Sequence, residues 1–335
     1  MARTSPFCAN VVVGYALGSW GLVGVGAFFL VSSFFLIGRN DKYDVRKIVR
    51  IALQTFFWYA VITLVSCARG IKPWEITYVS KELGKAIVVP FIGTYWYITA
   101  YIFMYLVYPF MNRIIEKLDL SHYRKLLIVW TLLLFIYTSV TNITLVYSDF
   151  NLAVYYYFLG GYLKRKPGNW FERNAGKAFF GSLLITFTLE VAGNLASTYQ
   201  GWTFGNTIIE RVLSRPYILS VTAAVSLFYL FKNMKMRNSK FINFLAEGSL
   251  GVYLIHENPI VFSYVWWSAF HLNTYFDSNK YAAAYVLSVL FIYGVSTMLD
   301  LVRLYCIEVP LNRVRIPALE HFFDRWNHWV VPKEE

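Results

Sequence analysis

Residues 4–38 read TSPFCANVVVGYALGSWGLVGVGAFFLVSSFFLIG and contain no charged side chain. A helix that crosses a membrane needs about 20 mostly apolar residues, and this run of 35 residues exceeds that length. Three other runs are also free of charge: Ile51–Ala68, Ala86–Asn112 and Tyr281–Leu299. The four runs predict transmembrane helices, so we expect an integral membrane protein.

The composition of the whole chain indicates a lipid environment. The chain is 57% hydrophobic and only 15% charged, whereas soluble domains carry about 25% charged residues. Five further apolar segments bring the predicted number of transmembrane helices to nine: Leu126–Thr141, Phe150–Leu163, Ala178–Leu195, Pro216–Phe231 and Gly248–Phe270. Because the loops are too short for a separate domain, we expect an all-α polytopic fold with residues 1–335 in a single membrane domain.

Lysine and arginine gather in alternate loops, which predicts the orientation because basic loops stay on the cytoplasmic side. The five basic groups hold 23 of the 31 basic residues and lie at residues 39–50, 113–125, 164–177, 232–240 and 303–333. The N-terminus is then outside and the C-terminus cytoplasmic. We expect a multi-pass protein of the cell membrane whose net charge of +12 faces membrane lipids, with no nucleic-acid partner.

Motifs of soluble enzymes are missing from the chain. The three cysteines, Cys8, Cys67 and Cys306, are scattered without metal-ligand spacing and are predicted to be apolar packing residues. The chain has no glycine-rich phosphate loop and no Gly-x-Ser-x-Gly sequence. We therefore expect no metal site and no soluble hydrolase chemistry.

Several segments, taken in order, point to a known family. They are GVGAFFLVSSF at residues 24–34, KIVR at 47–50, YWYITAY at 95–101 followed by YPF at 108–110, and LGVYLIHENP at 250–259. Together they resemble the membrane acyltransferase-3 family along nearly the whole chain. The resemblance implies about ten helices and transfer of an acyl group, usually acetyl, from cytoplasmic acyl-CoA to a hydroxyl of a glycan or lipid-linked sugar, as in O-acetylation of a cell-envelope polysaccharide.

The chain also departs from the family pattern. The family's first helix carries a basic residue and the histidine thought to be the general base, and no such pair precedes Trp20. The family's Ser-Gly reads Ser32-Ser33, and a polar residue expected nearby reads Gly26. The resemblance thus implies that a first helix is absent and that the activity of this chain is impaired.

Histidine at a helix break is the first catalytic candidate. Acyl transfer to a hydroxyl needs a base, and a histidine with a pKa of about 6.5 can take up and return a proton. His256 lies in the predicted helix 248–270, followed by Glu257, Asn258 and the helix-breaking Pro259. Ionisable residues at such depth are functional by default, although they can instead satisfy neighbouring helices. We predict catalytic roles for His256 and Glu257 and a substrate contact for Asn258.

Basic residues next to the second predicted helix are the donor-site candidates. Lys47 and Arg50 lie three residues apart, on one face of a helix. Arginine binds phosphate in a bidentate manner, so this pair, with Arg39 and Arg46 behind it, is predicted to hold the phosphates of acyl-CoA. The positive-inside rule alone gives an alternative explanation for the same residues.

Other polar and aromatic residues leave two interpretations each. Glu190, one turn before Asn194, either lines an acceptor cavity or is a solvated helix end. Trp96 and Tyr97 either stack on a sugar or belong to an interfacial aromatic belt. A further group near predicted helix ends is expected to reach water and to be structural: Gln54, Asp300 and Arg303.

Alternatives to an acyltransferase remain open at the level of the sequence. A transporter or flippase of lipid-linked sugars would share the many spans and the buried charge, although the repeats typical of transporters are not evident. An inactive homologue with a binding role fits the missing histidine. A glycan polymerase would need a larger outer loop than any in this chain.

Overall fold

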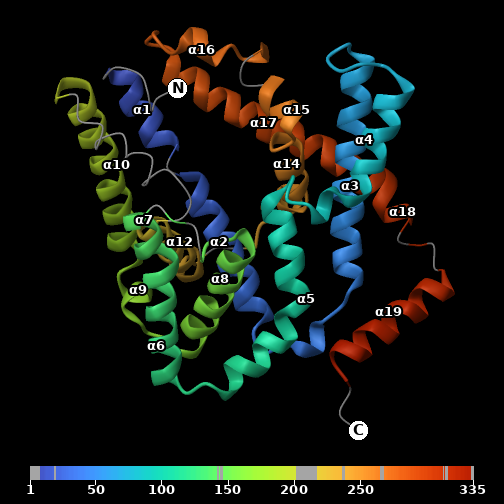
Figure 1. Cartoon of the computed structure of the whole chain (residues 1–335), viewed down its shortest axis with the longest axis horizontal. Helices are drawn as coiled ribbons and strands as arrows, with labels where there is room; N and C mark the ends of the chain where they lie inside the picture. Colours follow the sequence, from blue (N-terminus) through green and yellow to red (C-terminus); the bar gives the residue numbers. More distant parts are fainter. Residues whose placement is uncertain are drawn as a thin grey trace. The chain divides into compact units, whose positions relative to one another are not determined.

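The computed structural model describes residues 8–18, 20–141, 143, 146–200, 217–235, 238–264, 268–311, 313 and 316–332. Every regular element in these ranges is a helix, which confirms the all-α prediction (Figure 1). The chain divides into two compact units, Met1–Lys42 with Phe103–Lys235 and Tyr43–Ile102 with Met236–Glu335. We call them unit 1 and unit 2 and describe each by itself. Whether they form one functional domain stays a prediction.

Six helices in the described ranges are long and apolar enough to cross a membrane: Ala9–Leu36, Arg46–Ala68, Trp96–Lys117, Leu120–Tyr137, Ala175–Tyr199 and Tyr281–Leu311. Another apolar helix, Ile218–Asn233, is shorter. These helices confirm a membrane protein. The count of nine spans and the orientation of the two termini stay predictions, and part of the segment expected at Pro216–Phe231 lies outside the described residues.

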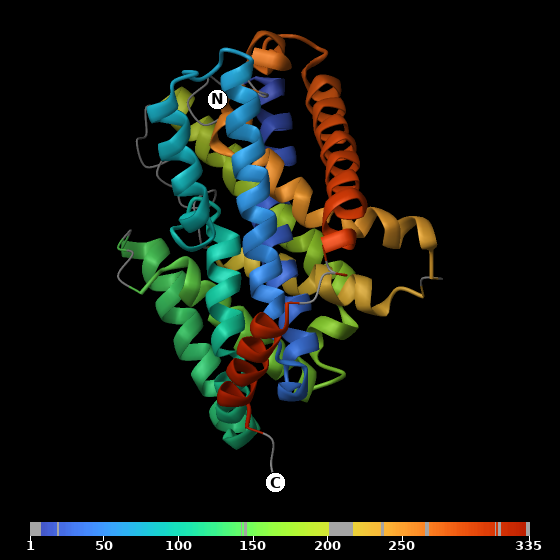
Figure 2. The same cartoon turned by 90° about the vertical axis from the view of Figure 1, so that its right-hand side faces the viewer.

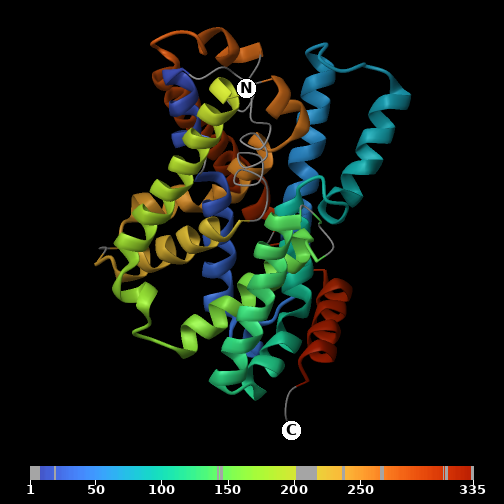
Figure 3. The ribbon, with the colours of Figure 1, turned by 60° about the vertical axis from the view of Figure 1, so that its left-hand side comes forward.

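Unit 1 is a bundle around α2 (Trp20–Leu36), which packs against α8 (Asp149–Arg165) and α12 (Ile218–Asn233), while α12 also packs against α10 (Ala175–Gln200) (Figure 3). The other elements of this unit are α1 (Ala9–Gly18), η1 (Asn40–Lys42), the end of α5 (Trp96–Lys117), α6 (Leu120–Thr131), η3 (Leu132–Tyr137), α7 (Thr138–Thr141) and α9 (Trp170–Arg173).

Small residues set how closely α2 approaches its neighbours. A Cβ atom on Gly26 would lie 2.5 Å from the Tyr156 hydroxyl and 2.8 Å from Ala224 Cβ. A Cβ on Gly160 would lie 2.8 Å from Ser33 Cβ. Small residues let membrane helices pack closely. The structure gives a packing reason for two of the departures from the family pattern: Gly26 leaves room for Tyr156, and a glycine of α8, Gly160, lies opposite Ser33.

The end of α8 and the start of α10 are joined by a well-anchored turn. Glu172 of α9 accepts hydrogen bonds from Lys232 Nζ at 2.7 Å and from the Gly168 backbone at 2.6 Å. Both interactions hold the pKa of the Glu172 carboxyl below its usual value. The amide of Asn233 donates to the Glu172 carbonyl at 2.9 Å. The short helix α9 is thus fixed to the end of α12.

Unit 2 is built on α3 (Arg46–Ala68), which packs against α4 (Ile76–Val88) and α14 (Ser249–His256), while α14 packs against α17 (Tyr281–Arg303). Its other elements are η2 (Val89–Phe91), the start of α5, α13 (Lys240–Glu247), α15 (Pro259–Tyr264), α16 (Leu272–Tyr275), η5 (Leu304–Glu308), α18 (Val309–Leu311) and α19 (Pro317–Val330).

The amphipathic helix α19 is bound to the beginning of α3 (Figure 2). The Arg46 guanidinium donates to Glu320 and to Asp324, each at 2.7 Å. The backbone N–H of Val45 donates to the Asn327 side chain at 2.9 Å. Arg46 is therefore already paired with two carboxylates, and α19 caps the first turn of α3.

The helix predicted at residues 248–270 is broken. It ends at His256 and restarts at Pro259, with Glu257 and Asn258 between the two pieces. Proline lacks the N–H that would continue the helix, and the Asn258 side chain accepts the Ile260 N–H at 3.0 Å to begin α15. Residues 265–267 of the predicted segment lie outside the described ranges.

The close contact of α2 with α8 predicts the effect of a single methyl group. Gly160→Ala should destabilise the protein by about 1–3 kcal/mol, the usual cost of overpacking, because its Cβ would meet Ser33. Ser33→Gly in the same chain should restore most of the loss. Thermal unfolding of the detergent-solubilised protein measures the effect. Gly181→Ala is the matched control, because open space surrounds Gly181. Equal melting of the Gly160 and Gly181 variants would contradict the packing argument.

Candidate active site

The break between α14 and α15 carries the histidine predicted to be catalytic. His256 Nδ1 lies 2.7 Å from the Val252 carbonyl. A carbonyl oxygen only accepts hydrogen bonds, so Nδ1 must carry the hydrogen and donate it. In the neutral imidazole the lone pair is then on Nε2. The geometry leaves Nε2 as the atom that can accept a proton.

Glu257 lies beside this nitrogen. Its Oε1 atom is 3.5 Å from His256 Nε2, and the two side chains are 39% and 33% exposed, respectively. A carboxylate at this distance stabilises an imidazolium once the histidine is protonated. The pair is therefore accessible and can store a proton temporarily.

Aromatic residues from the start of α5 pack around the same break. Asn258 is fully buried and donates to the Tyr95 hydroxyl at 3.0 Å. The Tyr253 hydroxyl accepts the Tyr97 backbone N–H at 3.4 Å, and the Tyr253 ring lies 5.5 Å from Tyr97 and 6.1 Å from His256. Within unit 2, then, the structure brings Tyr97 and Asn258 together with His256.

Trp96 continues this cluster on the same helix. Its ring is edge-on to that of Tyr97, with centroids 6.4 Å apart. Tyr95 is fully buried, so it is a packing residue and no member of an interfacial belt. The part that Trp96 and Tyr97 play toward a sugar stays a prediction.

A buried carboxylate lies one helix away from the break. Asp300 of α17 has no exposed surface. It accepts hydrogen bonds from Gln54 Nε2 at 3.1 Å, Trp58 Nε1 at 2.7 Å and Arg303 Nε at 2.7 Å. The expectation that Gln54, Asp300 and Arg303 reach water is wrong, because all three are buried. Their helices meet inside unit 2, and the charges pair there.

The same network continues toward the donor-site candidates. Arg303 Nη1 donates to Glu308 at 2.6 Å, and Glu308 lies 3.5 Å from Arg50 Nε. Arg50 is 58% exposed and Lys47 is also exposed, on the first turn of α3. Asp300 and Arg50 are thus connected through two intervening side chains.

Glycine brings α14 against this network. A Cβ atom on Gly251 would overlap the Asp300 side chain. Gly251 therefore allows α14 to lie directly on α17, five residues before His256. The buried carboxylate and the candidate base are held by the same pair of helices.

Three candidate residues lie in unit 1: Glu190, Asn194 and Arg39. Glu190 of α10 is fully buried and Asn194 is 2% exposed. The interpretation of Glu190 as a solvated helix end is therefore wrong, and the role in binding an acceptor stays a prediction. Arg39 is half-exposed and pairs with Asp41 at 3.4 Å.

Sequence reasoning missed Tyr253, Trp58 and Gly251. Tyr253 lies three residues before His256, on the same helical face, and this spacing was a usable signal. Trp58 and Gly251 belong to the site through their contacts with Asp300. These contacts join distant parts of the chain, so no local sequence pattern predicts them. In the described ranges, no group of histidine, cysteine and acidic side chains could hold a metal ion.

The contact of Gly251 with Asp300 makes a testable prediction. Gly251→Ala should lower the free energy of unfolding by about 3 kcal/mol or more, because the added methyl group must displace a buried, paired carboxylate. Gly294→Ala on α17 is the control, since nothing lies near Gly294. Thermal unfolding in detergent measures both variants. A Gly251 variant as stable as the control would show that α14 can shift away from Asp300 at little cost.

Comparison with known families supplies the remaining evidence. A family model described as an acyltransferase domain matches residues 5–301, which includes α14, the break after it and the donor-site candidates. Comparisons with curated proteins and with solved structures found no match. Because the matched segment covers far more than half of the 335 residues, the chain belongs to the membrane acyltransferase-3 family.

Proposed function

We propose that the protein is a multi-pass O-acyltransferase of the cell membrane that moves an acetyl group from cytoplasmic acetyl-CoA to a hydroxyl of a cell-envelope or exopolysaccharide sugar. The family supports an acyltransferase in general. The observation that carries the finer proposal is the geometry of His256, whose Nδ1 is fixed by the Val252 carbonyl while Nε2 stays available beside Glu257.

His256 acts as the base in this proposal. Nε2 takes the proton of the sugar hydroxyl as its oxygen attacks the thioester carbon. The carbon–sulfur bond then breaks, and the coenzyme A thiolate leaves with the proton returned by the imidazolium. Glu257, 3.5 Å away, stabilises the imidazolium between the two steps.

Asn258, Trp96 and Tyr97 contact the acceptor in the proposal. Asn258 is held beside the break by hydrogen bonds to Tyr95 and to the start of α15. Aromatic rings offer an apolar face for a sugar ring. Glu190 lies in unit 1. A buried carboxylate can accept hydrogen bonds from sugar hydroxyls, and whether Glu190 does so stays a prediction.

Lys47 and Arg50 of unit 2 bind the phosphates of acetyl-CoA in the proposal. Arg39 lies in unit 1, so its part in donor binding stays a prediction. Arg46 is excluded from this group because Glu320 and Asp324 already occupy its guanidinium. Arg50 is 58% exposed, and its Nε atom lies 3.5 Å from Glu308 Oε1. Phosphate can therefore approach Arg50 without displacing a tight ion pair.

The base assignment is tested by His256→Gln, which keeps a polar side chain of similar size but cannot take up a proton at neutral pH. Ester-linked acetyl on envelope glycans, measured in a host that lacks this activity, should fall by about 10²- to 10⁴-fold, the usual contribution of a general base. His122→Gln is the control, because His122 is exposed at the start of α6.

Other outcomes of this experiment separate the remaining functions. Full acetylation by the His256 variant would show that another residue is the base. No acetyl transfer by the unmodified chain, even with purified membranes and labelled acetyl-CoA, would favour an inactive homologue. Translocation of a labelled lipid-linked sugar by the same membranes would favour a flippase.

The donor site is tested by kinetics. Lys47→Gln and Arg50→Gln should each raise KM for acetyl-CoA about tenfold, which corresponds to the loss of about 1.4 kcal/mol of binding. The turnover number should stay nearly unchanged. Arg113→Gln, an exposed basic residue at the other end of α5, is the control. A fall in the turnover number at constant KM would contradict the donor site and would indicate that Lys47 and Arg50 instead help α3 to pack.

A further inference from the structure

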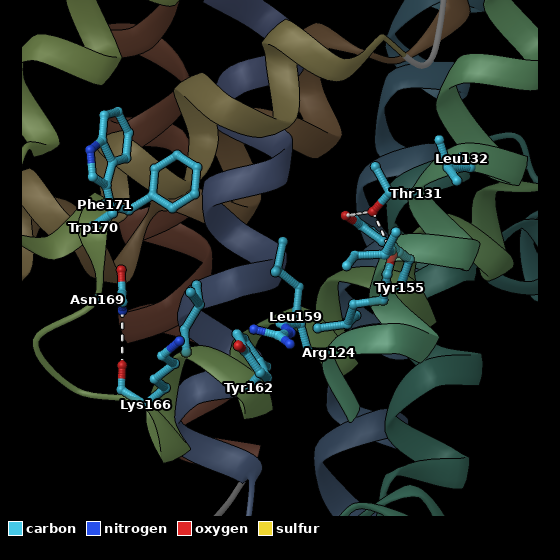
Figure 4. Close-up of a pocket in the computed structure, with 13 residues that line it drawn as sticks. Arg124, Thr131, Leu132, Tyr155, Leu159, Tyr162, Lys166, Asn169, Trp170 and Phe171 are labelled. Carbon is cyan, nitrogen blue, oxygen red and sulfur yellow. Dashed lines mark hydrogen bonds between the residues drawn. The ribbon is translucent and has the colours of Figure 1, made fainter. Parts of the chain in front are cut away.

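A groove of about 390 Å³ lies on unit 1, outside the residues used in the proposed function (Figure 4). Its walls come from α6, from the facing side of α8 and from α9. All of these elements belong to unit 1. The groove is therefore a property of this unit alone.

The walls of the groove are apolar. Ile128 and Leu132 on one wall are each 51% exposed, and Leu159 faces them from α8. Two hydroxyls in the wall are satisfied internally, because the Thr131 hydroxyl bonds to the Leu127 carbonyl at 2.6 Å and to the Tyr155 hydroxyl at 2.9 Å. Water gains few hydrogen bonds there, and a hydrocarbon chain fits the lining better.

Two cations lie at one end of the groove. Arg124 is on the first turns of α6, and Lys166 follows the last residue of α8, with its Nζ atom 6.0 Å from the centre of the Tyr162 ring. Figure 4 shows Arg124, Tyr162 and Lys166 in the lower half of the view, away from Leu132. In the part of the chain that the structure describes, neither cation has an ion pair.

Neighbouring basic residues have other partners. Lys164 donates to the carbonyls of Phe34 and Ile37, at 3.0 and 2.9 Å. Arg165 donates to the carbonyls of Ile115 and Leu118, each at 2.7 Å. These two side chains hold the ends of helices together. Arg124 and Lys166 differ from them because both line the groove.

The remaining wall is held in place by hydrogen bonds. It is formed by Trp170 and Phe171 of α9, and α9 is fixed to the end of α12 through Glu172. A ligand that enters the groove therefore meets a preformed surface, with little ordering left to oppose binding.

We propose that this groove binds an anionic phospholipid, with the phosphate at Arg124 and Lys166 and one acyl chain along Ile128, Leu132 and Leu159. Arg124 and Leu132 are eight residues apart, so the apolar wall is about 12 Å long at a rise of 1.5 Å per residue. Basic groups between membrane helices on the cytoplasmic side attract anionic head groups. A free phosphate ion would use the cations but leave the apolar wall exposed.

Lipid retention tests the proposal independently of acetyl transfer. The purified protein, stripped of lipid in detergent, is titrated with phosphatidylglycerol or with phosphatidylcholine of the same chains, and the bound lipid is counted by native mass spectrometry. We expect one phosphatidylglycerol per chain. Arg124→Gln with Lys166→Gln should weaken its binding tenfold or more. The matched control is Arg113→Gln with Lys125→Gln, two exposed cations that do not line the groove.

A second variant tests the acyl-chain part of the groove. Leu159→Trp should fill the groove and abolish binding while both cations remain, with thermal unfolding as the check that the variant is folded. Equal retention of phosphatidylcholine would overturn the role of the cations. If the control pair of substitutions weakened phosphatidylglycerol binding equally, the binding would depend on general surface charge and not on Arg124 and Lys166. If glycerol 3-phosphate alone displaced the lipid, the groove would be a site for a phosphate group and not for a phospholipid.

Discussion

The pairing of Asp300 is the interaction on which unit 2 depends. A carboxylate in an apolar interior costs several kcal/mol unless it is hydrogen-bonded and paired, and Asp300 receives its donors from Gln54, Trp58 and Arg303. Two of these donors come from α3, so α3 and α17 can only pack in the arrangement that satisfies the charge. Helix α14 can lie directly against this pair of helices, because Gly251 has no side chain that would overlap Asp300.

Unit 1 reaches a defined structure by a different physical route. Its central helix α2 carries no charge, and in lipid no hydrophobic effect drives one apolar helix onto another. Close approach at Gly26 and Gly160 supplies the dispersion contacts instead. The packing at the central helix of unit 1 thus rests on small residues, whereas the packing of α3 on α17 in unit 2 rests on a paired carboxylate.

Sequence patterns predicted what depends on neighbours in the chain. The charge-free run at residues 4–38 predicted one transmembrane helix, which the structure describes as α1 and α2, and Pro259 predicted the break after His256. The environment of Asp300 was not predictable, because Gln54 lies 246 residues away from it and nothing local distinguishes a buried carboxylate from one at a helix end. The burial of Glu190 was ambiguous for the same reason.

The ion pairs between α19 and α3 limit which substitutions the start of α3 can accept. It lies beyond the segment that matches the family, yet its acidic residues hold Arg46 at the start of α3. A chimera whose α3 lacks an arginine at position 46 would leave Glu320 and Asp324 without the cation that pairs them here. The two segments, more than 270 residues apart in sequence, should therefore be transplanted together.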